Sequence, residues 1–225
     1  MQIEVGDRWS IIGAAGSGKT TLSRQLLLTL AQGTRGRVPI YVLDTKNGGA
    51  AGDFKAFYQR GMGQRVKGNI VPKLFVPSGS APFLVWQPED DDLVMYEQFL
   101  HSLYKANNPL IVYYDELGSL TNPTATKFPA SYDKLLKQGR GLNKGSISVT
   151  QSPSYIPPNL LRQATHVVKM HINDEYDAKK LGRVLGRKAE EEPTDDYGFF
   201  YRHCAKPIAK SPVEYYKDYK EFFGL

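Results

Sequence analysis

The sequence predicts one α/β domain in which helices cover both faces of a mainly parallel central sheet, giving a three-layer sandwich. Short apolar segments typical of buried strands alternate with longer segments of helical periodicity along most of the chain. The strand segments are nearly continuous in apolar residues, as expected where both faces of a parallel sheet are covered. The 225 residues suffice for one such domain and are slightly short for two. We therefore expect residues 1–225 to form a single domain.

The first unit of this pattern is a strand, a glycine-rich loop, a helix and a second strand. Trp9–Ile12 is the first apolar run, and a helix with leucine at every fourth position follows as far as Gln32. Glycines and Pro39 end that helix, and Pro39–Asp44 is then predicted to be a buried strand. A strand–helix–strand unit of this kind implies parallel pairing and a right-handed crossover.

The alternation continues beyond this unit. Residues Asn47–Asn69 are predicted to form a loop with a short helix near Phe54–Arg60. Further strands are predicted, in order, at Leu74–Val76, Phe83–Trp86, Pro109–Asp115, Ser146–Thr150 and His166–Met170. Helical spacing predicts helices over Asp92–Lys105, Ser131–Gln138 and Asp174–Leu185. In the last of these helices, Tyr176, Leu181 and Leu185 are expected to face the core.

The character of the sequence changes after three consecutive glutamates, Glu190–Glu192. Tyr197–His203 is predicted to be an edge strand or one arm of a hairpin. Beyond Pro212, aromatic residues at helical spacing predict a C-terminal helix, which would contain Tyr215, Tyr216, Tyr219, Phe222 and Phe223. Such a segment packs either on its own core or on a partner, and the sequence leaves both open.

A phosphate-binding loop lies between the first strand and the first helix. This loop consists of Gly13, Ala14, Ala15, Gly16, Ser17, Gly18, Lys19 and Thr20, with Thr21 adjoining. It matches the pattern G-x-x-x-x-G-K-[ST] at all four fixed positions, which are Gly13, Gly18, Lys19 and Thr20. Glycines let backbone amides surround phosphate oxygens, and the following helix directs its positive end at the same anion. Lys19 would reach the β- and γ-phosphates, and the Thr20 hydroxyl would bind Mg²⁺. The sequence therefore predicts a P-loop protein that binds ATP with Mg²⁺.

Two acids end the later apolar strand Pro109–Asp115. In P-loop enzymes, an aspartate at such a strand end holds Mg²⁺, which assigns Asp115 to the metal together with Thr20. Glu116 is then placed to polarise the attacking water as a general base. This Asp-Glu pair favours a hydrolysing motor over a kinase, and it predicts an ATPase.

One later segment narrows the choice among P-loop proteins. Between Gly139 and Pro153 the chain carries a Gly-Arg pair, a glycine-containing stretch, an apolar strand and a Thr-Gln pair, in that order. This order resembles the FtsK–HerA superfamily of DNA-pumping ATPases, whose RecA-like core the resemblance places at about residues 8–186, with residues 187–225 as an extension. It implies that Gln151 is the polar sensor beside the γ-phosphate, and that Arg140 is the arginine finger offered to a neighbouring subunit. Lys137 and Arg162 are rival fingers.

Within this superfamily the chain looks most like the genome-packaging ATPases of tailless icosahedral double-stranded DNA viruses with an internal membrane. Its length leaves room for the motor core and little else. The resemblance implies a hexameric or pentameric homo-oligomeric ring, sequence-independent binding of double-stranded DNA, and action in the host cytoplasm or at the packaging vertex of the virion. A capsid-vertex or membrane protein is a further candidate partner. Three alternatives stay open: an assembly ATPase of filamentous phage export, a cellular or conjugative translocase core, and a non-motor nucleotide switch or kinase.

Charge and composition fit a polyanionic partner without proving one. The net charge is +6 and the isoelectric point about 9.2. Two basic regions could contact phosphates in a ring pore; they contain Lys46, Lys55, Arg60, Arg65 and Lys67, and Lys127, Lys134, Lys137, Arg140 and Lys144. The single cysteine and four histidines show no metal-ligand spacing. No run of about 18 apolar residues is present, so no transmembrane helix is expected.

Overall fold

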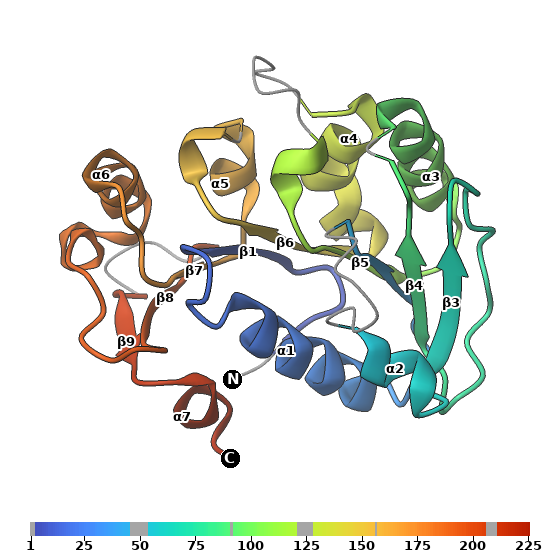
Figure 1. Ribbon diagram of the computed structural model, residues 1–225, viewed down its shortest axis with the longest axis horizontal. Helices are drawn as coiled ribbons and strands as arrows, with labels where there is room; N and C mark the ends of the chain where they lie inside the picture. The colour runs from blue at the N-terminus through green and yellow to red at the C-terminus, as the bar shows by residue number, and fades with distance from the viewer. Residues whose placement is uncertain (1–2, 46–53, 91, 121–127, 156, 206–210) are drawn as a thin grey trace.

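A nine-stranded sheet forms the centre of the computed structural model, which describes residues 3–45, 54–90, 92–120, 128–155, 157–205 and 211–225. The strand order is β3-β4-β2-β5-β6-β1-β7-β8-β9. Every pairing from β3 to β7 is parallel, and β8 and β9 are added antiparallel at one edge (Figure 1). The predicted α/β class, the mainly parallel sheet and the added hairpin are confirmed.

The strands are short, and β2, β4, β5, β6 and β7 are buried along their whole length. Their bounds are β1 Arg8–Ile12, β2 Ile40–Leu43, β3 Gly63–Lys67, β4 Phe83–Gln87, β5 Leu110–Tyr114, β6 Lys144–Thr150, β7 His166–Lys169, β8 Phe199–His203 and β9 Glu214–Tyr216. Successive residues point to opposite faces. In β2, Ile40 and Val42 enter one apolar cluster, whereas Tyr41 and Leu43 enter the cluster across the sheet.

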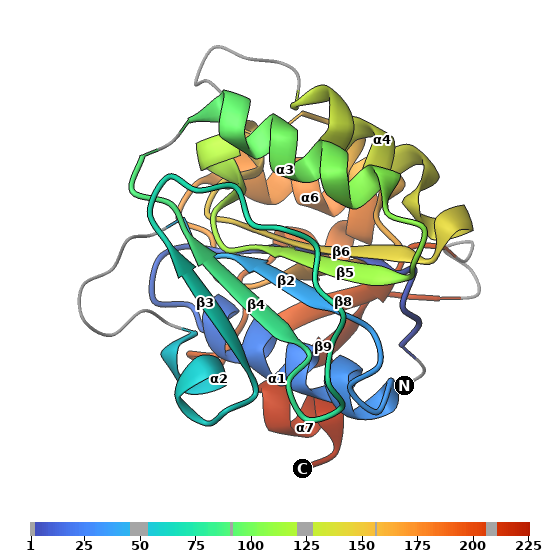
Figure 2. The same ribbon diagram turned by 90° about the vertical axis from the view of Figure 1, so that its right-hand side faces the viewer.

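Helices form a layer on each face of the sheet (Figure 2). One layer contains α3 Leu93–Lys105, α4 Ala130–Gln138, α5 Asn159–Gln163 and α6 Glu175–Leu185. The other contains α1 Lys19–Gly33, α2 Lys55–Gln59 and α7 Tyr219–Phe223. Short 3₁₀ segments occupy Leu117–Leu120, Gly139–Leu142, Pro153–Tyr155 and Arg187–Glu190. Among the described residues, no helix is both long and apolar enough to cross a bilayer.

Aspartates fix the starts of two predicted helices. The Asp92 carboxylate accepts a hydrogen bond from the Val94 amide at 2.8 Å and so caps α3. Asp174 caps α6 in the same way, through the Asp177 amide at 2.9 Å. α3 and α4 are also joined, because the Ser131 hydroxyl donates to Glu97 at 2.6 Å. The predicted helix starts at Asp92 and Asp174 are therefore one residue early, since each is the cap.

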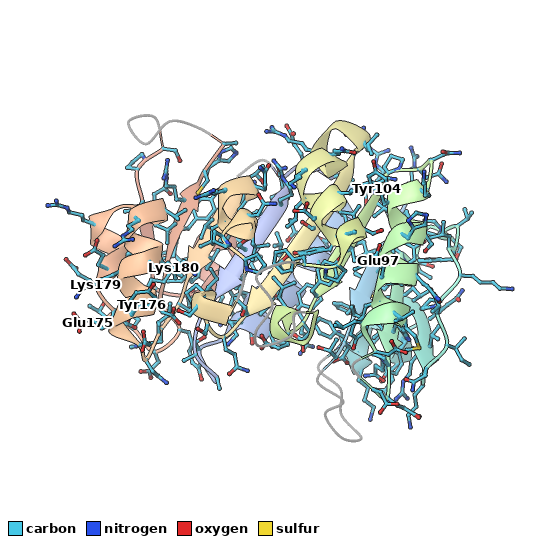
Figure 3. The ribbon with its side chains drawn as sticks, turned by 90° about the horizontal axis from the view of Figure 1, so that it is seen from above. Glu97, Tyr104, Glu175, Tyr176, Lys179 and Lys180 are labelled. Atoms are coloured by element: carbon cyan, nitrogen blue, oxygen red, sulfur yellow. The ribbon has the colours of Figure 1, made fainter. Side chains whose placement is uncertain are left out.

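Several sequence expectations are wrong, each for a physical reason. β3 lies within the predicted loop and was missed because this edge strand is half exposed and largely polar. Leu74–Val76 forms no strand; Phe75 packs edge-on against Tyr41, with ring centroids 5.4 Å apart. Tyr176 is 71% exposed on the outer side of α6 rather than facing the core (Figure 3).

The C-terminal prediction is half right. The helix is limited to α7, because Glu214–Tyr216 instead forms β9 and pairs with β8. β8 is consequently a hairpin arm with two partners and not an edge strand. The short helix α5 was not predicted. The aromatic tail packs on its own core, where Phe222 contacts Tyr201 at a ring-centroid distance of 5.0 Å.

Candidate functional site

The predicted phosphate loop follows β1 and leads directly into α1. Its first residue is tied to one neighbouring strand, since the Gly13 amide donates to the Thr150 carbonyl at 3.2 Å. Its second residue is tied to the segment that follows β7, the other strand beside β1, because the Ala14 amide donates to the His171 carbonyl at 2.6 Å. The loop is thus held at the carboxyl edge of the sheet, between the strands that flank β1.

Glycine is structurally required at three positions of this loop. Gly16 and Gly18 have φ angles of +78° and +94°, in the left-handed region that side chains disfavour. A Cβ atom at Gly13 would lie 2.7 Å from the Met170 Cβ and 2.7 Å from the Ser17 hydroxyl oxygen. The backbone geometry therefore explains the two fixed glycines of the motif, Gly13 and Gly18, and also favours glycine at the variable position 16.

Lys19 points back into the loop from the first turn of α1. Its Nζ donates to the carbonyl oxygens of Gly13 and Ala14, each at 2.6 Å, and the residue is only 5% exposed. A nearly buried ammonium group beside loop amides and a helix amino end makes a strongly anion-attracting site. Thr20, which follows, is half-buried, and Thr21 is exposed. These features fit a bound polyphosphate.

Asp115 directly follows β5 and is completely buried. Its Oδ1 accepts a hydrogen bond from the Tyr113 hydroxyl at 2.8 Å, and its amide donates to the Leu43 carbonyl at 3.1 Å. Burial, together with the Asp115 charge, raises the pKa of Tyr113 well above its ordinary value, so the hydroxyl stays protonated and orients the carboxylate. Carboxylate and hydroxyl oxygens of the kind offered by Asp115 and Thr20 suit Mg²⁺.

Glu116 and Gln151 are brought together from two adjacent strands. The Gln151 side-chain amide donates to Glu116 Oε2 at 3.2 Å, and the Gly118 amide lies 3.4 Å from Oε1. Since β5 and β6 are parallel neighbours, residues just beyond their ends meet at the same edge as the phosphate loop. The two residues predicted as general base and sensor are thus in direct contact.

A second polar group at this edge contains Asp44, the acid that ends the second predicted strand; its partners Gln87 and Arg65 were not identified from the sequence. The buried carboxylate of Asp44, after β2, accepts a hydrogen bond from the Gln87 side chain at 2.6 Å. Gln87 in turn accepts one from Arg65 Nε at 2.7 Å. The position of Asp44 at the end of a predicted strand was the available signal, because acids at adjoining strand ends share one edge of a parallel sheet.

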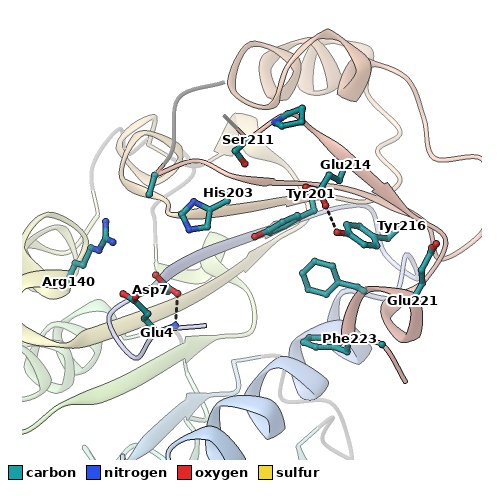
Figure 4. A pocket seen from close by; sticks show the side chains of 14 residues that line it. Glu4, Asp7, Arg140, Tyr201, His203, Ser211, Glu214, Tyr216, Glu221 and Phe223 are labelled. Atoms are coloured by element: carbon teal, nitrogen blue, oxygen red, sulfur yellow. Dashed lines mark hydrogen bonds between the residues drawn. The ribbon is translucent and has the colours of Figure 1, made fainter. Parts of the chain in front are cut away.

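Arg140 lies at the opposite end of the sheet from the phosphate loop. It precedes β6, whose seven residues span about 20 Å, and the loop follows the carboxyl end of the adjoining parallel strand β1. Arg140 is exposed and borders a cavity of about 860 Å³ that is also lined by Glu4, Asp7, Tyr201 and Glu221 (Figure 4). Arg140 therefore does not reach the phosphate loop of its own chain.

The rival fingers differ in their surroundings. Lys137 forms an ion pair with Asp133 one turn earlier on α4. Arg162 is exposed near the end of α5, just before β7, and so lies at the same end of the sheet as Arg140. Geometry alone therefore keeps Arg162 as a rival to Arg140.

The predicted DNA-contacting residues are placed unequally. Lys46 and Lys127 lie outside the described residues. Lys144 is a poor candidate, because it is 3% exposed and its ammonium donates to the Tyr104 carbonyl. Exposed candidates remain in both regions: Arg60, Arg65, Lys67, Lys134, Lys137 and Arg140.

A buried polar pair supports the sheet end that carries Arg140. Asp7 Oδ2 lies 3.1 Å from His166 Nε2, and the Tyr201 hydroxyl lies 3.0 Å from His166 Nδ1. Burial disfavours the charged form of Asp7 and so raises its pKa. Hydrogen bonds with His166 and the Glu4 amide, together with the positive charge of Arg140, lower the pKa by more than burial raises it. The pKa of Asp7 therefore lies below its ordinary value of 3.8.

Replacing Asp7 with asparagine should destabilise the protein at pH 7 by about 1–3 kcal/mol, because it removes the charge from a buried hydrogen-bonded group. A pKa lowered by folding gives stability that is complete above the unfolded-state value and is lost as the pH falls through the folded value. The difference in unfolding free energy between D7N and the wild type should therefore shrink below about pH 4. Urea unfolding at pH 7 and at pH 3.5 measures it; a pH-independent difference would contradict the assignment.

Comparison with known protein families and with curated proteins finds no match to this chain. Solved structures do match. The genome packaging NTPase B204 from Sulfolobus turreted icosahedral virus 2, in complex with AMPPCP, superposes with a TM-score of 0.74 at 14% identity, covering 96% of this chain and 98% of that one. The same protein was also solved with ATP-gammaS, and it superposes with a TM-score of 0.70 at 15% identity.

Two larger proteins share the fold over part of their length. The pCW3 conjugation coupling protein TcpA gives a TM-score of 0.66 at 15% identity, covering 95% of this chain and 61% of that one. EssC from Geobacillus thermodenitrificans gives a TM-score of 0.62 at 15% identity, covering 88% of this chain and 38% of that one. At such identities the likeness establishes a common fold, and this fold agrees with the α/β P-loop architecture expected from the sequence.

Proposed function

We propose that this chain is an ATPase that translocates double-stranded DNA and packages a viral genome into a preformed capsid. The observation that carries the proposal is the division of polar groups between the two ends of one sheet. The phosphate loop, Asp115 and the Glu116–Gln151 pair share the carboxyl edge, whereas Arg140 is exposed at the amino edge. A copy whose amino edge lies against the carboxyl edge of the next copy would complete the site of that neighbour.

The carboxyl edge supplies the groups needed for ATP hydrolysis. Lys19 and the loop amides would bind the phosphates. Asp115 and Thr20 would hold Mg²⁺, which would offset the negative charge of the phosphates. Glu116 would accept a proton from the attacking water, and Gln151 would orient both. A guanidinium from the next copy would stabilise the charge that spreads over the transferring phosphoryl group.

Because the catalytic groups and Arg140 lie at opposite ends of the sheet, each site would need an arginine from a neighbouring copy, and a ring supplies one to every copy. An interface that joins one surface of a subunit to a different surface of the next closes into a ring when the rotation permits, and we propose a hexamer or pentamer. Exposed basic residues such as Lys67 and Lys134 could then hold DNA phosphates in the channel without reading the sequence. The ring would act in the host cytoplasm or at the packaging vertex, against a capsid or membrane protein.

The degree of structural similarity favours packaging over a conjugative translocase. The viral packaging NTPase superposes with a TM-score of 0.74, whereas the conjugation coupling protein gives a TM-score of 0.66. A conjugative translocase core is the second candidate, supported by the same fold. Neither candidate requires a specific DNA sequence.

ATP turnover with and without DNA tests this function. We expect duplex DNA of any sequence to stimulate turnover, and stimulation to fall as salt rises, because phosphate contacts release counterions. Displacement of a third strand from a triplex would report translocation, with Glu116→Gln as a variant that binds ATP but turns it over poorly. Turnover that is insensitive to duplex DNA would favour the nucleotide switch, and stimulated turnover without strand displacement would exclude a pump.

A further inference from the structure

A second cavity lies directly beside the phosphate loop and is unused by the chemistry described above. Its volume is about 320 Å³, within the range of about 300–1,000 Å³ typical of small-molecule sites. It is lined by Gly18, Thr21, Leu22, Met170, Tyr197, Asp218, Tyr219 and Lys220. The lining joins the end of the phosphate loop to a C-terminal segment far away in the sequence.

The cavity combines an apolar floor with aromatic walls and a polar rim. Leu22 and Met170 are buried and form the floor. Tyr197 lies against the loop, since a Cβ atom at Gly18 would be 3.1 Å from its ring. Tyr197 is nevertheless 59% exposed, so the packing of the core does not account for its large ring at this place. Flat aromatic faces beside a phosphate site are suited to stacking on a nucleobase.

The C-terminal wall of this cavity is held firmly by the core. α7 is anchored by Phe222, whose ring lies 5.4 Å from Phe199 and 6.3 Å from Trp9. The turn before Tyr197 is fixed as well, because the Tyr215 hydroxyl donates to Asp195 at 2.6 Å. The C-terminal extension therefore builds a defined surface next to the loop.

We infer that this cavity binds the nucleobase of the nucleotide whose phosphates lie on residues 13–20, with Tyr197 and Tyr219 as the stacking residues. The inference rests on the proposed ATP-binding function. Gly18 and Thr21 belong both to the phosphate loop region and to the cavity, so a base linked through ribose to bound phosphates reaches it. Asp218 Oδ1 accepts a hydrogen bond from the Glu221 amide at 2.9 Å and so caps α7. The second carboxylate oxygen, Oδ2, can accept a hydrogen bond from a base with an exocyclic amino group, such as adenine. The aromatic extension thereby becomes part of the nucleotide site.

Calorimetric titration with ATPγS and with inorganic triphosphate separates base binding from phosphate binding. Tyr197→Ala should weaken ATPγS binding by about tenfold to a hundredfold, as expected for the loss of one stacked base contact, and should leave triphosphate affinity unchanged. Tyr197→Phe should bind ATPγS like the wild type, because the ring is retained. Tyr219→Ala should act in the same direction, and Tyr176→Ala on the far side of α6 is the matched control.

The outcomes are separable. If Tyr197→Ala binds ATPγS as tightly as the wild type while Lys19→Ala binds neither ligand, the base site is wrong and the phosphate site stands. If Lys19→Ala binds both ligands normally, the proposed function itself fails. Tyr197 decides the question because its exposed side chain can be removed without opening the core, which Tyr219→Ala does not guarantee.

Discussion

Arg140→Ala is expected to lower ATP turnover by about 10³–10⁵-fold, the range typical of an arginine finger, while leaving the affinity for ATPγS within error of the wild type. The reason is geometric. Arg140 lies about one strand length from its own phosphate loop, so its loss removes nothing from nucleotide binding within a chain. Under the proposed function, it removes the charge that a neighbouring copy would offer during phosphoryl transfer.

Steady-state turnover and calorimetric binding measure these two quantities, with two control variants that the chain provides. Arg162→Ala and Lys137→Ala each remove a positive charge from the region and should retain most of the activity. Arg140→Lys should remain strongly impaired, because an ammonium group lacks the planar fork of a guanidinium. Loss of turnover in Arg162→Ala with normal turnover in Arg140→Ala would transfer the role to Arg162.

Lys19→Ala is expected to reduce turnover by at least about 10²–10³-fold, the cost of removing one donor aimed at a developing charge, and to weaken nucleotide binding as well. The Lys19 ammonium is nearly buried and already directed into the loop, so it has little water of its own to lose when phosphate binds. Its loss should therefore affect both the ground state and the transition state.

The measurement for Lys19 pairs turnover with thermal unfolding, since alanine also removes the donor to the Gly13 and Ala14 carbonyls. Lys180→Ala is a matched control, because that lysine also donates to a backbone carbonyl, that of Pro153, but on α6. Folded Lys19→Ala protein with normal turnover would refute the phosphate site.

Local chemistry made the loop and the strand-end acids predictable from sequence. Gly16 and Gly18 adopt conformations that favour glycine, so the motif carries its own structural signature. The contact between Glu116 and Gln151 follows from each lying just past a buried strand, once β5 and β6 are parallel neighbours. Such features depend on short stretches of chain and on the rules of parallel sheets.

Features that depend on strand order or on distant packing were not predictable. The hydrogen bond between Asp44 and Gln87 requires β2 to lie beside β4, which no local pattern specifies. The cavity beside the loop unites Gly18 with Tyr197 and Tyr219, about two hundred residues later in the chain. Tyr176 was misplaced because helical spacing fixes a face only to within neighbouring positions, and a tyrosine at its margin can turn outward.

Mixing two inactive variants tests the shared site most directly. Lys19→Ala lacks a working phosphate loop but still presents Arg140, whereas Arg140→Ala keeps the loop and lacks the arginine. If Arg140 acts on a neighbouring copy, an equal mixture should regain about a quarter of wild-type turnover on random assembly, since some intact loops then face an intact arginine. A mixture no more active than its separate components would contradict a site completed between two copies.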